Sequence, residues 1–192
     1  MPELPTTARG IATHQRILDA AAAEFARVGL AGARMDRITA AADANKAQLY
    51  AYFGSKEGLF DAVVADRVDT STDDAPFDPD DLPGWAVRLY DQNLRHPEVA
   101  RLIAWTRLER RPTGRWFDGD QHQPKIEAIA AAQSAGRVRA GDPVDLLVLL
   151  IGMASAWSPA SSVYAATADE PATDHDQRRD LLREAVGRTV AP

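Results

Sequence analysis

Apolar residues recur at three- and four-residue intervals along most of the chain, which is the spacing of an amphipathic helix. Between positions 13 and 29 this stripe consists of Ile17, Leu18, Ala21, Phe25 and Val28. Thr13 is suited to be the N-cap of that helix, and Gly29 is suited to end it. Alanine, the strongest helix former, is abundant, and the β-branched runs typical of strands are missing. The pattern predicts an all-α fold.

Three further helices are expected before residue 70. Two of them are short, at about residues 36–42 and 46–52, and Asn45 is placed to cap the second one. A longer helix begins at Ser55 and carries its apolar side chains on one side, at Leu59, Phe60, Val63 and Val64. Together with the first helix, these elements predict an N-terminal domain over residues 10–70.

The second part of the chain also has helical spacing. Residues 70–84 are rich in Asp, Pro, Ser and Thr and are predicted to form a linker. Beyond it, the expected helices lie near 82–95, 98–110, 121–135 and 174–188, with an apolar helix of about twenty residues that begins at Asp142. These elements predict a C-terminal domain over residues 80–192 and about nine helices in all.

Residues 34–53 have the pattern of a helix-turn-helix, in which two short helices joined by a tight turn pack on a longer one. The second helix of this motif enters the major groove of DNA. Leu49 and Phe53 are spaced to pack inward, which leaves Lys46, Ala47, Gln48, Tyr50 and Tyr52 to face DNA. A Gln amide suits adenine, a Lys suits guanine or phosphate, and an Ala can meet the thymine methyl group. Lys56 follows Ser55 at a helix N-terminus, where an ammonium group and the helix can hold one phosphate together.

The stretch NKAQLYAYFGSKEGLF closely resembles the signature of TetR-family transcriptional regulators. The matching positions are Leu49, Tyr50, Tyr52, Phe53, Ser55, Lys56, Glu57 and Leu59. The resemblance covers residues 13–68 and implies a helix-turn-helix DNA-binding domain followed by a helical ligand-binding and dimerisation domain. It also implies that bases are approached by Lys46, Ala47, Gln48 and Ala51, and phosphates by Tyr50, Tyr52 and Lys56.

Two positions depart from the family pattern. The turn before the recognition helix has Asp43 where the family usually has Gly, and Asp is among the side chains that best tolerate a positive φ. The second helix begins in the stretch AlaArgMet at 33–35, where the family often has a Thr or Ser that caps the helix and meets a phosphate. Arg34 is expected to replace that phosphate contact, and Arg37 to add another.

Charge is unevenly distributed along the chain. The 192 residues have a net charge of −6 and a pI near 5.2, which alone would argue against DNA binding. Residues 1–60, however, contain seven Lys or Arg residues against six Asp or Glu residues, so a local basic surface remains possible. The N-terminus has no apolar signal-peptide region, and the longest apolar run, 146–157, is too short to span a membrane. We therefore expect a cytoplasmic protein with no membrane partner.

The sequence offers little support for an enzyme or a metal protein. The chain has no cysteine, which excludes disulfides and thiolate ligands. Asp118, Asp120 and His122 form a loose acidic cluster that matches no defined metal site, and an ordinary polar loop is the favoured interpretation. Neither a dinucleotide-binding motif, a P-loop nor a nucleophile motif is present. We expect no enzymatic activity and no cofactor.

The aromatic residues of the C-terminal part have two interpretations. As a set they suit an apolar pocket for a small-molecule effector, lined by some of Tyr90, Trp105, Trp116, Phe117 and Trp157. They also suit a filled core with no cavity. In the first interpretation the effector is apolar or aromatic, and a carboxylate on it would be anchored by Arg107, Arg110 or Arg111.

The run LLVLLIGMASAW at 146–157 is apolar around most of its circumference, so it needs cover from its own domain and from a partner. Members of the TetR family usually pair their last two helices into a four-helix dimer interface, and residues 142–165 and 174–188 match that role. The sequence thus predicts a homodimeric regulator, most simply a repressor, that leaves a palindromic operator when an effector binds. The alternatives are a DNA-binding architectural protein of the same fold without a ligand and, in third place, a helical enzyme.

Overall fold

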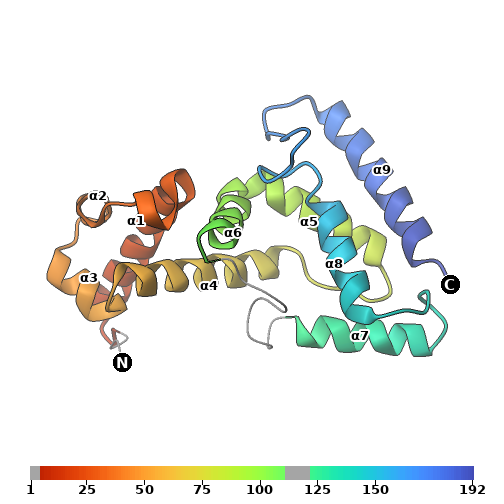
Figure 1. Cartoon of the computed structure of the whole chain (residues 1–192), viewed down its shortest axis with the longest axis horizontal. Helices are drawn as coiled ribbons and strands as arrows, with labels where there is room; N and C mark the ends of the chain where they lie inside the picture. Colours follow the sequence, from red (N-terminus) through yellow and green to blue (C-terminus); the bar gives the residue numbers. More distant parts are fainter. Residues whose placement is uncertain (1–4, 111–121) are drawn as a thin grey trace. The chain divides into compact units, whose positions relative to one another are not determined.

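The computed structural model describes residues 5–110 and 122–192, and the side chains of these residues apart from 69–74. Within these ranges the chain forms nine helices and no strand, which confirms the predicted all-α fold (Figure 1). The chain divides into two compact units, Met1–Thr70 with Glu98–Pro112, and Ser71–Pro97 with Thr113–Pro192. No helix in the described ranges is long and apolar enough to cross a membrane.

The first unit is built on α1 (Ala8–Gly32), α2 (Met35–Ala41), α3 (Lys46–Phe53) and the larger part of α4 (Lys56–Asp74). Its core is aromatic and aliphatic, and the Phe25 and Phe60 rings meet edge to face with centroids 5.0 Å apart. Large aliphatic side chains that are fully buried beside them include Ile17, Ile38, Leu49 and Leu59. These residues come from four different helices, so the short helices α2 and α3 are held by packing rather than by their own length.

The helix α6 (Pro97–Arg110) also belongs to the first unit. Trp105 lies against α1, where its indole Nε1 donates a hydrogen bond to the Ala26 carbonyl over 3.3 Å. The Glu109 carboxylate accepts from the Ala31 backbone N–H at 3.2–3.3 Å. An element far along the chain therefore completes the N-terminal unit.

The second unit packs α8 (Pro143–Ala154) and α9 (Ala172–Val190) on α5 (Leu82–Arg95), and α7 (Gln123–Ser134) on α8. Figure 1 draws α8 in front of α5. Trp85, Tyr90, Ile129 and Leu150 are at most 1% exposed and form the centre of its core. This unit therefore has its own hydrophobic core, as expected for a separate folding unit.

Three predicted helix boundaries differ from the structure. α1 begins at Ala8, where Thr7 is the N-cap and accepts from the Gly10 N–H at 3.1 Å, so Thr13 lies inside the helix. α4 continues to Asp74, into the predicted linker. The apolar helix α8 has 12 residues rather than about twenty and ends at Ala154. Pro159 excludes a helix of about twenty residues from Asp142, because proline disfavours helical geometry at the residue before it and cannot donate a backbone hydrogen bond, but α8 already ends four residues before residue 158.

Candidate functional site

The turn between α2 and α3 has the geometry of a helix-turn-helix. Asp43 has a φ of 47° and is the one non-glycine residue with a positive φ among those described, which confirms the expectation for this position. The Ala44 N–H donates to the Thr39 carbonyl over 3.0 Å and so closes the turn. Asp is among the residues that adopt this conformation at the lowest cost, so the turn forms without the family's usual glycine.

α3 begins with a reciprocal cap. The Asn45 side chain accepts from the Gln48 backbone N–H at 2.8 Å, and the Gln48 side chain accepts from the Asn45 N–H at 3.4 Å. This confirms Asn45 as the N-cap and adds a role for Gln48 that the base-contact interpretation lacks. Two backbone donors at the helix start are satisfied, and the Gln48 side chain is held at the end of the helix that enters a DNA groove.

The two sides of α3 differ as predicted. Leu49 is fully buried and Phe53 is 5% exposed, and both pack into the core of the first unit. The exposed residues are Lys46, Ala47, Gln48, Tyr50 and Ala51. Tyr52 is half-buried, because its ring meets His14 of α1 edge to face at a centroid distance of 5.6 Å. Five of the six predicted contact residues on this helix thus share one accessible surface.

The basic side chains around α3 have protein partners. Lys46 lies 2.5 Å from the Asp36 carboxylate, and the hydrogen bond to Asp36 raises the pKa of Lys46. The Lys56 ammonium donates to the carbonyls of Ala31 and Ala33 at 3.3 and 3.2 Å, at the C-terminal end of α1. Lys56 therefore ties α4 to the end of α1, a structural role in addition to the predicted phosphate contact.

Arg34 and Arg37 are exposed and lie at the start of α2 around one acidic residue, Glu24 of α1. Arg34 occupies the N-cap position without a side-chain cap, and its backbone N–H donates to Glu24 over 3.3 Å. Arg37 lies 3.8 Å from Glu24, and Arg27 donates to the same carboxylate over 2.6 Å. Burial raises the pKa of Glu24, but these hydrogen bonds and charges outweigh it, and the net shift is downward. Nothing in the local sequence pattern indicates this role of Glu24, because its partners lie up to 13 residues away.

The predicted effector-binding residues fall in different places. Tyr90 and Trp157 lie in the second unit, where their rings meet edge to face at 5.7 Å. Trp105, a residue of α6, packs against α1 in the first unit, and Trp116 and Phe117 lie outside the described residues. Of the three proposed carboxylate anchors, Arg110 pairs with Asp61 at 2.9 Å, and Arg111 is also outside the described residues.

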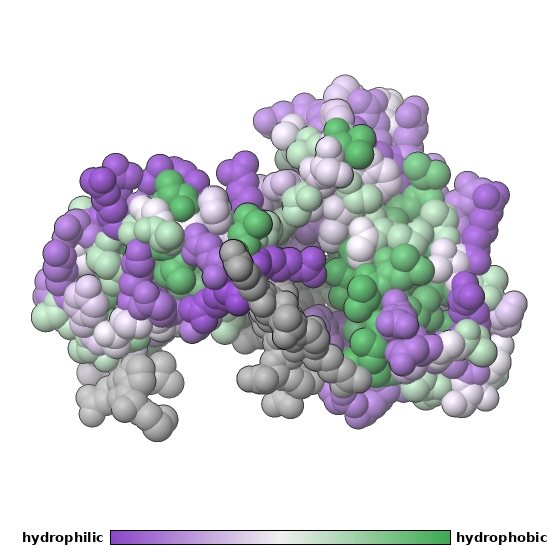
Figure 2. Space-filling model, in the orientation of Figure 1, coloured by the Kyte–Doolittle hydropathy of each residue, from purple (hydrophilic) through white to green (hydrophobic). Residues whose placement is uncertain are grey.

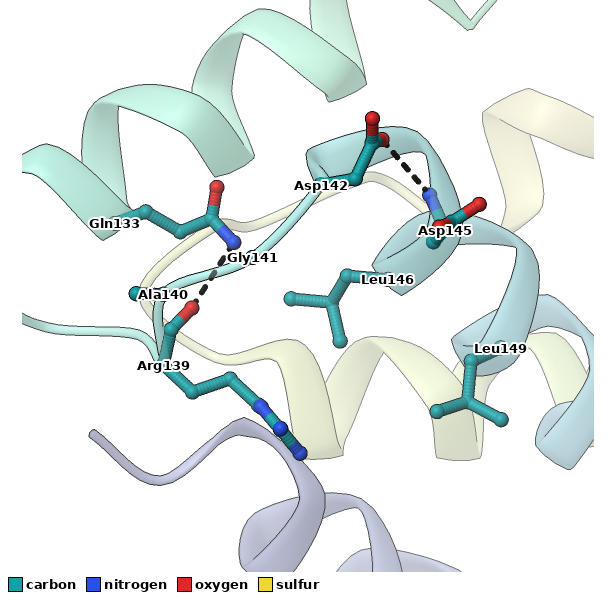
Figure 3. A pocket seen from close by; sticks show the side chains of 8 residues that line it. All are labelled: Gln133, Arg139, Ala140, Gly141, Asp142, Asp145, Leu146 and Leu149. Carbon is teal, nitrogen blue, oxygen red and sulfur yellow. Dashed lines mark hydrogen bonds between the residues drawn. The ribbon is translucent and has the colours of Figure 1, made fainter.

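A hollow of about 210 Å³ lies between the end of α7 and the start of α8 (Figure 3). Asp142 caps α8 by accepting from the Val144 and Asp145 N–H groups at 2.7 and 3.2 Å. On the other side, the Gln133 amide donates to the Arg139 carbonyl over 2.9 Å. The remaining lining residues are Ala140, Gly141, Leu146 and Leu149. None of the aromatic residues named above lines this hollow, and two of its polar side chains, Asp142 and Gln133, already bind backbone groups of the helix start and the loop.

Metal-ligating side chains do not converge anywhere in residues 5–110 and 122–192: these ranges hold no group of three or more His, Cys, Asp or Glu residues suited to a metal ion. Asp118 and Asp120 fall outside the described residues. Burial and the charge of Lys125 lower the pKa of His122, the third residue of that sequence cluster.

Comparison with known proteins agrees with this geometry. The family model for bacterial regulatory proteins of the tetR family matches residues 17–63, and the model for the tetracyclin repressor-like C-terminal domain matches residues 81–188. The HTH-type transcriptional repressor SCO4008 of Streptomyces coelicolor is 38% identical over 186 residues, which cover 93% of this chain and 95% of that protein. The HTH-type transcriptional repressor NicS of Pseudomonas putida is 33% identical over 104 residues, about half of each chain.

Among solved structures, the transcriptional regulator SCO4942 from Streptomyces coelicolor superimposes with a TM-score of 0.75 at 35% sequence identity. The match covers 93% of this chain and 98% of that one. These relatives are transcriptional regulators, not enzymes. The chain therefore belongs to the TetR family and is a DNA-binding transcriptional regulator.

Proposed function

We propose that this protein is a homodimeric repressor that binds a palindromic operator through α3 and leaves it when a small, largely apolar effector binds the second unit. The observation that carries the proposal is the capped helix α3, which buries Leu49 and Phe53 and leaves Lys46, Ala47 and Gln48 exposed at its start. The N-terminal residues of a recognition helix are those that contact base edges. Two curated relatives bear the name repressor, which supports repression rather than activation. Because an operator is reached where the chromosome lies, this proposal includes a cytoplasmic location.

A palindromic operator requires two copies of the chain, because a single recognition helix contacts too few base pairs for useful specificity. The exposed side of α8 supports a dimer: Val148 is 64% and Leu149 is 48% exposed, and Leu181 on α9 is 56% exposed. Figure 2 shows hydrophobic side chains gathered over α8. An uncovered apolar surface of this kind is typical of a protein–protein interface.

Effector binding is proposed for the part of the second unit that contains Tyr90 and Trp157. Large aromatic rings provide extensive contact area with few polar requirements, which suits an apolar or aromatic effector. Tyr90 is 1% exposed, so an effector that reaches it has to displace packed side chains. That requirement is compatible with regulation, because an effector acts only if it binds one arrangement of the protein better than another.

A band-shift experiment tests this proposal, with DNA from the regulated promoter and a matched scrambled duplex. Wild-type protein should shift the promoter fragment at concentrations at least about 1,000-fold below those needed for scrambled DNA. An inducing compound should then weaken operator binding by about 5- to 150-fold. Specific binding that no compound alters would instead support the ligand-independent architectural protein. Equal binding to both duplexes would contradict sequence-specific regulation.

A further inference from the structure

An ion pair joins the two short helices of the helix-turn-helix. Lys46 is the first residue of α3, and Asp36 lies in the first turn of α2. The Lys46 ammonium is 2.5 Å from the Asp36 carboxylate, and the two side chains are 57% and 77% exposed. The N-terminal residues of a recognition helix are those that contact base edges. The Asp36 carboxylate therefore lies where Lys46 would meet DNA, although Asp36 is not among the contact residues predicted from the sequence.

Stability gives little reason for a carboxylate at this place. Exposed ion pairs contribute little, because water screens the charges and two side chains must be ordered. An acidic residue in the first turn of a helix favours that helix, as Glu57 does in α4, but this effect needs no lysine partner. Close to phosphates, the charge of Asp36 also repels DNA. The carboxylate favours DNA binding only if it contacts a base that offers a donor.

The hydrogen-bonding groups of the pair have a definite order. A lysine ammonium has three N–H donors, so one directed at Asp36 leaves two for DNA. An ionised carboxylate accepts at two oxygens, so the Asp36 oxygen that does not face Lys46 can accept from a base. The pair thus presents two donors on the lysine, followed by one acceptor on the aspartate.

This order matches one kind of base pair in the major groove. A G·C pair presents two neighbouring acceptors, guanine N7 and O6, and then the N4 amino donor of cytosine. An A·T pair presents an acceptor, a donor and an acceptor, so it has no two neighbouring acceptors. We propose that Lys46 and Asp36 together read one G·C base pair in each operator half-site, with Lys46 on guanine and Asp36 on the cytosine amino group. The inference rests on the proposed function, in which α3 binds an operator, and it names one base pair of that operator.

The ion pair also favours base contacts of Lys46 over phosphate contacts. A phosphate is bound mainly by charge, and Asp36 offsets the charge of Lys46. A guanine is bound by directed hydrogen bonds, whose donors the pair leaves available. Asp36 therefore weakens binding to unrelated DNA more than binding to the operator. This makes Asp36 a specificity-determining residue.

The test uses the full-length protein and the duplex that the wild type selects from random DNA. Each of the four base pairs is placed in turn at every position of the half-site, and fluorescence anisotropy measures the affinity. One position should require G·C in the wild type. There Lys46→Ala should reduce the preference for G·C by about 5- to 150-fold, the range of a lysine contact to guanine. Asp36→Ala should reduce the same preference by about 2- to 10-fold, the range of one hydrogen bond.

Controls separate base readout from a general effect of charge. Glu57→Ala removes the same charge from the first turn of α4 and should leave every base preference unchanged. Asp36→Ala should also bind a scrambled duplex more tightly than the wild type does. Its salt dependence should steepen by about one unit, because the unpaired Lys46 can then meet a phosphate. If Asp36→Ala does not fold, Asp36→Asn keeps the size and should shift the preference toward A·T, since an amide suits adenine.

Several results would overturn the inference. They are unchanged base preferences in Asp36→Ala, equal changes in Glu57→Ala, and losses at two different positions in Lys46→Ala and Asp36→Ala. A lower salt dependence in Lys46→Ala with every base preference intact would place Lys46 on a phosphate and overturn it as well. In all these cases the wild type still selects an inverted repeat, so the proposed operator binding stands. A wild type that selects no motif would contradict the proposed function, and this inference with it.

Discussion

The Asn45 and Gln48 side chains each accept a hydrogen bond from the backbone N–H of the other residue, at 2.8 and 3.4 Å. This reciprocal pair lies at the start of α3, the end of a recognition helix that faces base edges. Gln48 thus caps the helix and is also exposed where DNA is expected. Its two roles can be separated by substitution, because a carboxylate can accept from the same N–H while repelling DNA.

The Gln48→Glu variant should therefore fold as the wild type does but bind the operator more weakly. Glutamate occupies this capping-box position as well as glutamine does, so the melting temperature should stay close to that of wild type. Its negative charge and its lack of an amide donor should cost about 1–3 kcal/mol in operator binding. Fluorescence anisotropy with labelled operator measures the loss. Asn45→Ala is the converse control, and it should lower the stability of the protein by about 1 kcal/mol. If the Gln48→Glu variant binds the operator with unchanged affinity, Gln48 does not contact a base.

Lys56 and Lys46 should differ in what their replacement changes. Lys56→Ala removes two hydrogen bonds from a charged donor to carbonyls near the end of α1 and should destabilise the first unit by about 1–3 kcal/mol. Lys46→Ala removes only an exposed ion pair with Asp36 and should leave the stability almost unchanged. Both variants should reduce the salt dependence of DNA binding by about one unit if both ammonium groups meet phosphates. Urea unfolding and affinity at several salt concentrations separate these effects, and equal stability of the two variants would contradict the structural role of Lys56.

Local chemistry made much of the first unit predictable. Asn45 as a cap, Asp43 at a positive φ and Leu49 with Phe53 as the buried pair all follow from residue types and spacing within a few positions. The capping role of Gln48 was also readable, because Asn at the cap with Gln three residues later has the spacing of a capping box. The sequence analysis assigned Gln48 only a contact to a DNA base and did not use the capping-box spacing.

Long-range contacts were not predictable from spacing. Trp105 belongs to a helix that pattern assigns to the C-terminal domain, yet it packs on Ala26 of α1, 79 positions away. Glu24 organises the start of α2 through partners that no local motif indicates. Pro159 was a local signal against an apolar helix of about twenty residues, and the continuous apolar run outweighed it in the prediction. Apolar periodicity indicates which residues need burial but not which element buries them.

Gly29 should be harder to replace than Gly54, although both have a positive φ. It has a φ of 71°, and a Cβ there would lie 2.7–2.8 Å from the Trp105 ring and would also collide with Glu109. Gly54 has nearly the same φ of 73° but nothing within 4 Å of an added Cβ. Gly54→Ala should therefore cost about 1–2 kcal/mol of backbone strain, and Gly29→Ala should cost clearly more. Thermal unfolding of the two variants makes the comparison. Equal costs would show that α6 does not press on α1 at Gly29.

Dimerisation can be tested at exposed positions of α8. Leu149→Asp should produce a folded monomer, because the side chain is 48% exposed in the single chain while a buried, unpaired charge is costly at an interface. Leu150→Asp cannot serve this purpose: Leu150 is fully buried in its own unit, so the substitution should unfold the protein. Leu108→Asp on α6, where the leucine is 68% exposed, is the matched control and should leave the dimer intact. Sedimentation at micromolar concentration measures the oligomeric state of each protein, and a monomeric wild type would contradict the proposed dimer.

His14 should make the stability of the first unit depend on pH. Its ring stacks on Phe53 at a centroid distance of 4.7 Å. Burial lowers the pKa of His14 below its ordinary value of 6.5, and the nearby Asp66 opposes this only in part. The unfolded chain then binds the proton more readily than the folded one, so stability should fall as the pH drops below 6.5 toward the folded pKa, and should level off above 6.5. His14→Phe keeps the stacked ring and removes the proton, and its unfolding free energy should vary less across this window. An identical pH profile for both proteins would contradict the assignment.

Sequence-specific recognition of a palindrome by α3 is tested most directly by selection of bound duplexes from random DNA with the purified wild-type protein. The account predicts enrichment of an inverted repeat whose half-sites are centred about one helical turn, or a multiple of it, apart. It also predicts that Gln48→Glu fails to enrich that sequence under the same conditions. Recovery of no common motif, or of the same motif by both proteins, would contradict the assignment of α3 as the recognition helix.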